Sequence, residues 1–167
     1  MADNIVVSDA GPLHYLILID CAEVLATLFN HVLVPLAVRD ELIHPGAPQK
    51  VKDWMNQSRP WLKLASVSAV QPVRGLHRGE TEALQLAVEH KAVALLMDDM
   101  DGRAAARQLG LPTVFTVAIL ELGAERGLLD LPTAIAKLRQ TSFFVSQEIL
   151  DAALERDKNR RRGAKEN

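Results

Sequence analysis

Short apolar segments that end directly in acidic residues constrain the fold of this chain more than any other feature. Ile5–Ser8 is an apolar, β-branched run followed by Asp9, and residues 92–97 form a second apolar run followed by Asp98 and Asp99. Continuous apolar runs of this length are typical of strands buried on both faces of a parallel sheet. Because helical segments separate such runs along the chain, we predict a parallel α/β sheet covered by helices on both faces.

The periodicity of the remaining chain predicts the other elements. Three further short segments, 32–34, 62–67 and 113–115, are expected to bring the sheet to about four to five strands. Asp20 is expected to cap a helix that begins at Cys21. Helices are predicted over residues 13–17, 21–29, 35–42, 46–57, 78–90, 103–109, 117–126, 131–140 and 146–156.

The length of 167 residues fits a single domain. We expect this domain to span residues 1–156 and to be followed by a charged, flexible tail over residues 157–167. The tail carries five basic residues, which could neutralise RNA phosphates, dock on an acidic partner, or simply be solvated. Because the formal charge of the whole chain is −2, RNA binding must come from local basic patches or from metal ions.

Cysteine usage and hydropathy indicate a compartment. Cys21 is the only cysteine, so it cannot form an internal disulfide, and a reducing cytoplasm is the simplest expectation. The first four residues carry no positive charge, which argues against a signal peptide. No apolar run approaches the roughly 20 residues that cross a bilayer. We therefore expect a cytoplasmic protein without a membrane span.

Acidic side chains are expected to converge at the carboxyl edge of the sheet. Asp9, Asp98 and Asp99 follow strands, and right-handed crossovers place the ends of parallel strands at one edge, where open α/β sheets bind ligands. Glu41 lies near the border of the buried face of its helix, and Glu80 lies one turn before the apolar stripe of another helix. Taken singly, each acid also fits an ordinary role in a turn, at a helix cap or in the first turn of a helix.

A cluster of carboxylates predicts a hard cation. At about 4 Å, each pair of like charges costs around 4 kcal/mol at an effective dielectric constant near 20, so such a cluster needs protons or cations. Oxygen ligands suit Mg²⁺ or Mn²⁺ rather than Zn²⁺. Such ions activate water and neutralise the charge that builds up on a phosphate during attack. Phosphodiester hydrolysis is therefore the reaction that the acids indicate.

Three segments carry a resemblance to a known family. They are Val6–Leu13, Leu76–Leu84 and Leu95–Asp99, the last of which is followed by Gly102 and Arg103. In order and spacing these segments resemble the PIN-domain family, and within it a prokaryotic subgroup of small proteins. The similarity runs from about residue 5 to residue 125, and the combined pattern is more specific than any one segment.

The resemblance implies a three-layer α/β/α sandwich with a central parallel sheet, and a metal-dependent endoribonuclease that is often the toxin of a toxin–antitoxin pair. The acids of the family fall on Asp9, Glu41 and Glu80, and on Asp98 or Asp99, which the pattern does not separate. All five are the expected catalytic residues, and all but Glu41 are the expected ligands of Mg²⁺ or Mn²⁺. Many relatives carry Asp where this chain has Glu80. The implied partners are an RNA substrate, an antitoxin protein and a second copy of the chain.

Two other functions remain open from the sequence. A non-catalytic binding module could keep the same fold, although it would have no need for uncompensated carboxylates. A phosphoacceptor signalling domain also places acids at strand ends, but no clear lysine follows a late strand here. Residues 13–29 and 38–55, with Trp54 and Met55, are rich in apolar side chains. These either mark a homodimer interface or pack on the chain's own core.

Overall fold

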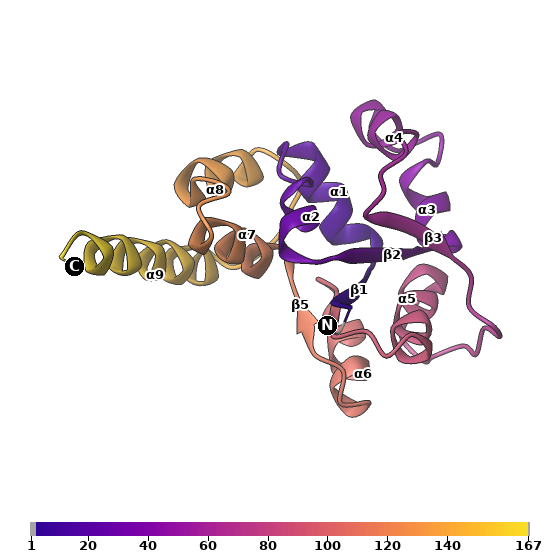
Figure 1. Cartoon of the computed structure of the whole chain (residues 1–167). Coiled ribbons are helices and arrows are strands. Elements are labelled where there is room, and N and C mark those ends of the chain that lie inside the picture. Colours follow the sequence, from indigo (N-terminus) through magenta and orange to yellow (C-terminus); the bar gives the residue numbers. More distant parts are fainter. Residues whose placement is uncertain (1–2, 167) are drawn as a thin grey trace.

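Five parallel strands form one sheet in the computed structural model, which describes residues 3–166 (Figure 1). The sheet order is β3-β2-β1-β4-β5, and every neighbouring pair is parallel. Residues 1, 2 and 167, which belong to the predicted domain start and tail end, lie outside the described residues. The strands are β1 Ile5–Ser8, β2 His31–Pro35, β3 Leu62–Ala65, β4 Ala94–Leu96 and β5 Thr113–Val114.

Nine helices flank this sheet in the described part of the chain. They are α1 Ala10–Leu18, α2 Val24–Leu28, α3 Leu36–Leu42, α4 Gln49–Met55, α5 Arg78–Glu89, α6 Met100–Gln108, α7 Thr116–Glu125, α8 Leu131–Arg139 and α9 Gln147–Lys165. The N-terminal ends of α1, α3, α5 and α6 follow the carboxyl edge of the sheet, and α7, α8 and α9 come last in the chain.

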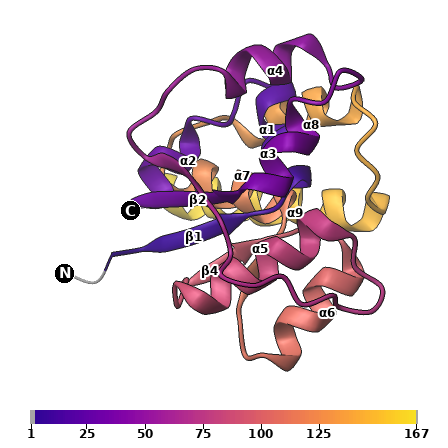
Figure 2. The same ribbon diagram turned by 90° about the vertical axis from the view of Figure 1, so that its right-hand side faces the viewer.

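Alternating side chains of the central strand divide the interior into two cores. Val6 and Val7 of β1 are both fully buried, but they belong to different hydrophobic clusters. The cluster around Val6 packs against α1, α2, α7 and α8, whereas the cluster around Val7 packs against α5 and α6. Figure 2 shows α5 and α6 below the strands and α1 and α4 above them. The predicted three-layer α/β fold with a parallel sheet is therefore confirmed.

The strand order creates one point where the direction of the chain across the sheet reverses. From β1 the chain proceeds to β2 and β3 on one side, and then returns to β4 on the other side of β1. Ser8 pairs with Leu96, so β1 and β4 end side by side. Ligands of open α/β sheets bind at such a switch point, beyond the carboxyl ends of the strands. The fold thus places Asp9 and the Asp98–Asp99 pair at this edge.

Two helices begin almost a turn later than the sequence predicts. Asp20 does not cap a helix at Cys21: it adopts a left-handed backbone conformation with φ 60° and pairs with Lys50 at 2.8 Å, and α2 begins only at Val24. The helix predicted from residue 46 begins at Gln49, because a turn precedes Pro48. In both places, turn residues occupy the positions predicted for the first turn of the helix. Local propensity does not distinguish such a turn from the start of a helix.

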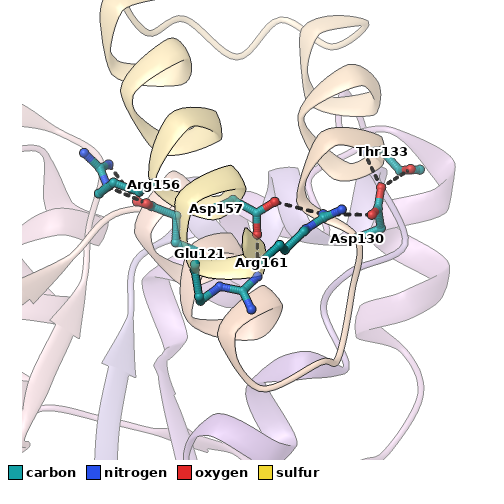
Figure 3. Close-up of polar contacts among 7 residues, drawn as sticks. Glu121, Asp130, Thr133, Arg156, Asp157 and Arg161 are labelled. Atoms are coloured by element: carbon teal, nitrogen blue, oxygen red, sulfur yellow. Dashed lines mark hydrogen bonds and ion pairs between the residues drawn. The ribbon is translucent and has the colours of Figure 1, made fainter. Parts of the chain in front are cut away.

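The last helix is longer than predicted. It was expected to end at Arg156, but α9 continues to Lys165. Asp157, only 6% exposed, accepts a hydrogen bond from Arg160 and forms an ion pair with Arg161, both one turn further along the helix. Arg161 also contacts Asp130, which precedes α8. Its guanidinium group thus lies between the carboxylates of Asp157 and Asp130 (Figure 3). These contacts hold the charged segment as a helix, a result that the run of charges alone did not predict.

The apolar residues behind the homodimer prediction pack on the chain's own core. Trp54 and Met55 are partly buried against the larger hydrophobic cluster. The guanidinium group of Arg59 lies 3.6 Å from the centre of the Trp54 ring, and Trp61 packs beside it. The homodimer thus remains a prediction from the family resemblance alone. Within residues 3–166, no helix is both long enough and apolar enough to cross a membrane.

Candidate active site

Asp9 occupies the centre of the candidate site. It follows β1, and its backbone N–H donates to the carbonyl oxygen of Leu96 at 3.0 Å, which fixes it beside the end of β4. Its side chain precedes α1 without capping that helix, and the residue is only 5% exposed. Among the described residues, no hydrogen-bond partner is found for its buried Oδ1 atom. A buried carboxylate oxygen without a partner is costly unless a proton or a cation is bound to it.

Neighbouring acids increase this cost. The pKa of Asp9 is raised from 3.8 to about 7, and burial is the largest cause. The charges of Glu41 and Glu80 contribute to this rise, while the backbone hydrogen bond from Ala10 and the charge of His77 oppose it. Three of the five predicted site residues therefore lie within electrostatic reach of one another, although they come from β1, α3 and α5. Their proximity is the convergence that the sequence predicted.

His77 links Glu41 and Glu80. It caps α5 in a reciprocal arrangement. The His77 ring atom Nδ1 accepts a hydrogen bond from the backbone N–H of Glu80 at 3.3 Å, and the backbone N–H of His77 donates to Glu80 Oε2 at 3.1 Å. Its Nε2 lies 3.0 Å from Glu80 Oε1, and its Nδ1 lies 3.6 Å from Glu41 Oε1. Burial raises the pKa of both glutamates, and His77 lowers it.

His77 is not among the site residues that the sequence predicts. Its spacing of three residues before Glu80, at the start of an amphipathic helix, is the spacing of a capping box, in which the two residues contact each other. That spacing could have identified the pair.

Asp98 and Asp99 have different environments. Asp98 Oδ1 accepts the backbone N–H of Thr116, and Oδ2 accepts the Thr116 hydroxyl, both at 2.7 Å. Burial raises the pKa of Asp98, these two hydrogen bonds lower it, and the Arg103 charge lowers it further. Asp99 caps α6 by accepting the backbone N–H of Gly102 at 2.8 Å, and its charge raises the pKa of Glu80. The charge of Asp99 thus acts on Glu80, whereas Asp98 is held at the start of α7 by Thr116.

Glu82 is a further buried acid of α5, and the sequence does not place it with the site acids. Its separation of two residues from Glu80 puts it on a different side of α5. There it is only 4% exposed, and its Oε2 accepts the backbone N–H of Ala37 at 3.1 Å in the first turn of α3. Its Oε1 accepts from Arg78 Nε at 3.0 Å. Glu82 therefore holds the start of α3, the helix that carries Glu41, against α5.

The donor set fits a hard cation in its chemistry. The side chains supply carboxylate oxygens, one of which is buried without a partner among residues 3–166, and burial raises the pKa of Asp9, Glu41, Glu80 and Asp98. Within residues 3–166, however, three or more acid, histidine or cysteine groups do not meet closely enough to enclose an ion. The reason is local: His77 contacts both glutamates, and Thr116 holds Asp98. An ion would compete with these contacts.

Replacing Gly79 with Ala tests the role of Glu41 without removing a carboxylate. A Cβ atom on Gly79 would overlap Glu41 Oε1, so the glutamate side chain must move. That side chain is 41% exposed and flexible, so we expect the fold to persist, with stability unchanged or raised by up to about 1 kcal/mol. We expect metal-dependent activity to fall by roughly tenfold or more, measured as initial rates on a labelled RNA.

Gly163→Ala is the matched control for this substitution. Gly163 also lies inside a helix, and a Cβ atom there would meet nothing within 4 Å. Equal activity of Gly79→Ala and Gly163→Ala would show that the position of the Glu41 carboxylate does not matter for the reaction.

Comparisons with known proteins agree with the fold. A family model described as a PIN domain matches residues 5–159. Among solved structures, a PilT N-terminus domain protein from the hyperthermophilic archaeon Sulfolobus solfataricus P2 is similar in fold, with a TM-score of 0.52 and 19% sequence identity. The match covers 69% of this chain and 89% of that chain. The search of curated proteins gave no match.

Proposed function

The chain belongs to the PIN-domain family, whose members are generally nucleases that use divalent metals, and on this basis we propose that it is a ribonuclease dependent on Mg²⁺ or Mn²⁺. The reaction would be the hydrolysis of phosphodiester bonds in RNA by an endoribonuclease. One observation carries the proposal: the carboxylate of Asp9 is buried at the switch point of the sheet, has an oxygen without a partner among the described residues, and lies within reach of further acids.

We assign the metal ligands to Asp9, Glu80, Asp98 and Asp99, with Glu41 as a further acid of the site. When bound, the ion supplies an activated water and neutralises charge on the phosphate. Asp99 is the better placed of the aspartate pair, because its charge already acts on Glu80. Asp98, held by Thr116 on both oxygens, positions the end of β4 against α7. Glu82 positions α3, and thereby Glu41.

Divalent ions are expected to raise the melting temperature through these acids. Binding to the native state alone stabilises by about 2.7 kcal/mol at a hundredfold excess over Kd. Mn²⁺ titrations monitored by differential scanning fluorimetry measure this shift in the wild type and in a triple variant, Asp9→Asn, Asp98→Asn and Asp99→Asn. We expect a shift of several degrees in the wild type, and most of it lost in the variant.

Glu125→Gln, Glu148→Gln and Glu155→Gln together provide the control for this titration, because these three acids are exposed on α7 and α9. The control should keep the wild-type shift. If the site variant kept it as well, the ions would bind elsewhere and the assignment of the ligands would fail.

The finer parts of the proposal derive from the family resemblance. They are a role as the toxin of a toxin–antitoxin pair, an antitoxin protein as partner, a homodimer and a cytoplasmic location. The alternative remains a non-catalytic PIN-like module that binds nucleic acid or protein. Cleavage of a labelled RNA in Mn²⁺, abolished by EDTA and by Asp9→Asn, distinguishes the enzyme from this module.

A further inference from the structure

The charge of the chain is distributed unevenly. Residues 157–167 contain five basic and two acidic side chains, a formal charge of +3, which leaves −5 for residues 1–156. All five acids of the candidate active site belong to residues 1–156. A polyanion such as RNA is repelled by such a surface, so an enzyme that acts on it gains from positive charge elsewhere. This chain concentrates its positive charge on the end of α9.

Three cations on α9 form a row that we call the basic stripe: Lys158, Arg162 and Lys165. Their spacing of four and three residues puts them on one face of the helix, and at 1.5 Å per residue the row is about 10 Å long. All three are exposed, and within residues 3–166 they take no part in the ion pairs that engage Arg156, Arg160 and Arg161. The stripe is therefore available to external anions.

The fold holds the stripe in place. Asp157, buried at the base of this segment, binds Arg160 and Arg161, and Arg161 binds Asp130 at 3.0 Å, the residue that caps α8 (Figure 3). These contacts join the charged end of α9 to α8. The stripe borders a groove of about 490 Å³ that is also lined by Pro132 and Leu154. Rigid placement reduces the entropy lost when the cations bind a partner.

The stripe lies away from the acids of the candidate site. Figure 1 shows the end of α9 projecting to the side opposite α3 and α5, the helices that carry Glu41 and Glu80. An RNA held by both surfaces must therefore span part of the molecule. Short fragments would reach only one of them.

We propose that the basic stripe of α9 binds the phosphate backbone of the RNA substrate at a distance from the carboxylate site. This inference rests on the proposed ribonuclease function. An acidic protein segment is the other anionic partner such a stripe could take. The observations favour RNA, because a nuclease with an acidic site and a net negative body needs a positive surface for its substrate, and this stripe supplies it.

Fluorescence anisotropy with a labelled single-stranded RNA of roughly 30 nucleotides tests the proposal. The measurement uses the Asp9→Asn full chain in EDTA, so that no cleavage occurs. The test variant combines Lys158→Gln, Arg162→Gln and Lys165→Gln. Because each phosphate contact on a single strand contributes about 0.7 to the salt slope, removing three should reduce the slope by about 2 and weaken binding roughly 10- to 100-fold near 0.1 M salt.

A second set of three substitutions is the control: Lys63→Gln, Lys91→Gln and Lys137→Gln remove the same charge from exposed lysines outside α9. The control should bind RNA nearly as the wild type does. Equal weakening in both variants would mean that only net charge matters, and an unchanged affinity and salt slope in the stripe variant would leave an acidic protein as the occupant. Either result overturns the proposal.

Cleavage assays on chains with an intact Asp9 separate this proposal from the proposed function. The stripe variant should cleave an RNA of roughly 5 nucleotides at the wild-type rate and one of roughly 30 nucleotides with a raised KM. RNA binding by the stripe without any metal-dependent cleavage would refute the ribonuclease and keep the stripe. Metal-dependent cleavage with the same KM in wild type and stripe variant would refute RNA binding by the stripe and keep the ribonuclease.

Discussion

Replacing Asp9 with Asn is expected to lower RNA cleavage by roughly a thousandfold or more, equivalent to about 4 kcal/mol of transition-state stabilisation. Asn preserves the size of the side chain but removes the charge of the one site carboxylate with a buried oxygen lacking a partner among the described residues. Initial rates on a labelled RNA in Mn²⁺ measure the loss. Circular dichroism should show an unchanged fold, because Asp9 holds its place through backbone contacts to β4.

Asp53→Asn is the control for this loss, because Asp53 is exposed on α4 and accepts a hydrogen bond from Gln49 that an Asn can also accept. Asp53→Asn should cleave at the wild-type rate. An Asp9→Asn protein that is folded and equally active would remove Asp9 from the proposed metal site.

The stability of the metal-free protein should fall as the pH rises from about 4 to 7. Burial and the neighbouring glutamates raise the pKa of Asp9 from 3.8 to about 7, so the folded state retains a proton that the unfolded state has lost. A raised carboxyl pKa thus favours folding below pH 4, and this advantage disappears by pH 7. A difference of about 3 pKa units corresponds to at most about 4 kcal/mol. Burial raises the pKa of Glu41, Glu80 and Asp98 in the same direction.

Urea unfolding of wild type and Asp9→Asn in EDTA isolates the part that belongs to Asp9. The other carboxylates titrate in both proteins, so the difference between their free energies of unfolding cancels most of their effect. We expect Asp9→Asn to be the more stable protein at pH 8, and the difference to shrink towards pH 4. With saturating Mn²⁺ the order at pH 8 should reverse, because the ion binds the ionised wild type. If the difference between the two free energies of unfolding were constant across this pH range, the ionisation of Asp9 would not destabilise the folded protein.

The sequence by itself determined the layers of the fold and the edge at which the acids meet. Burial on both faces requires the continuous apolar run of β1, and a parallel sheet requires a helix between strands, so pattern and topology follow from local residues. The acid that ends β1 and the pair that ends β4 then necessarily share the carboxyl edge. These inferences depend only on which residues are apolar and where each run stops.

Only the tertiary structure decided how the individual side chains of the site are used. Thr116, eighteen residues after Asp98, binds that carboxylate, and Glu82 binds the backbone of α3, forty-five residues before it. Such partners are set by the angles at which helices cross the sheet, which apolar periodicity does not encode. The end of α9 depended likewise on the ion pair between Asp157 and Arg161, and on the contact of Arg161 with Asp130 before α8. A run of charged residues is disordered or helical according to whether a partner side chain lies within reach, and that reach exists only in the folded chain.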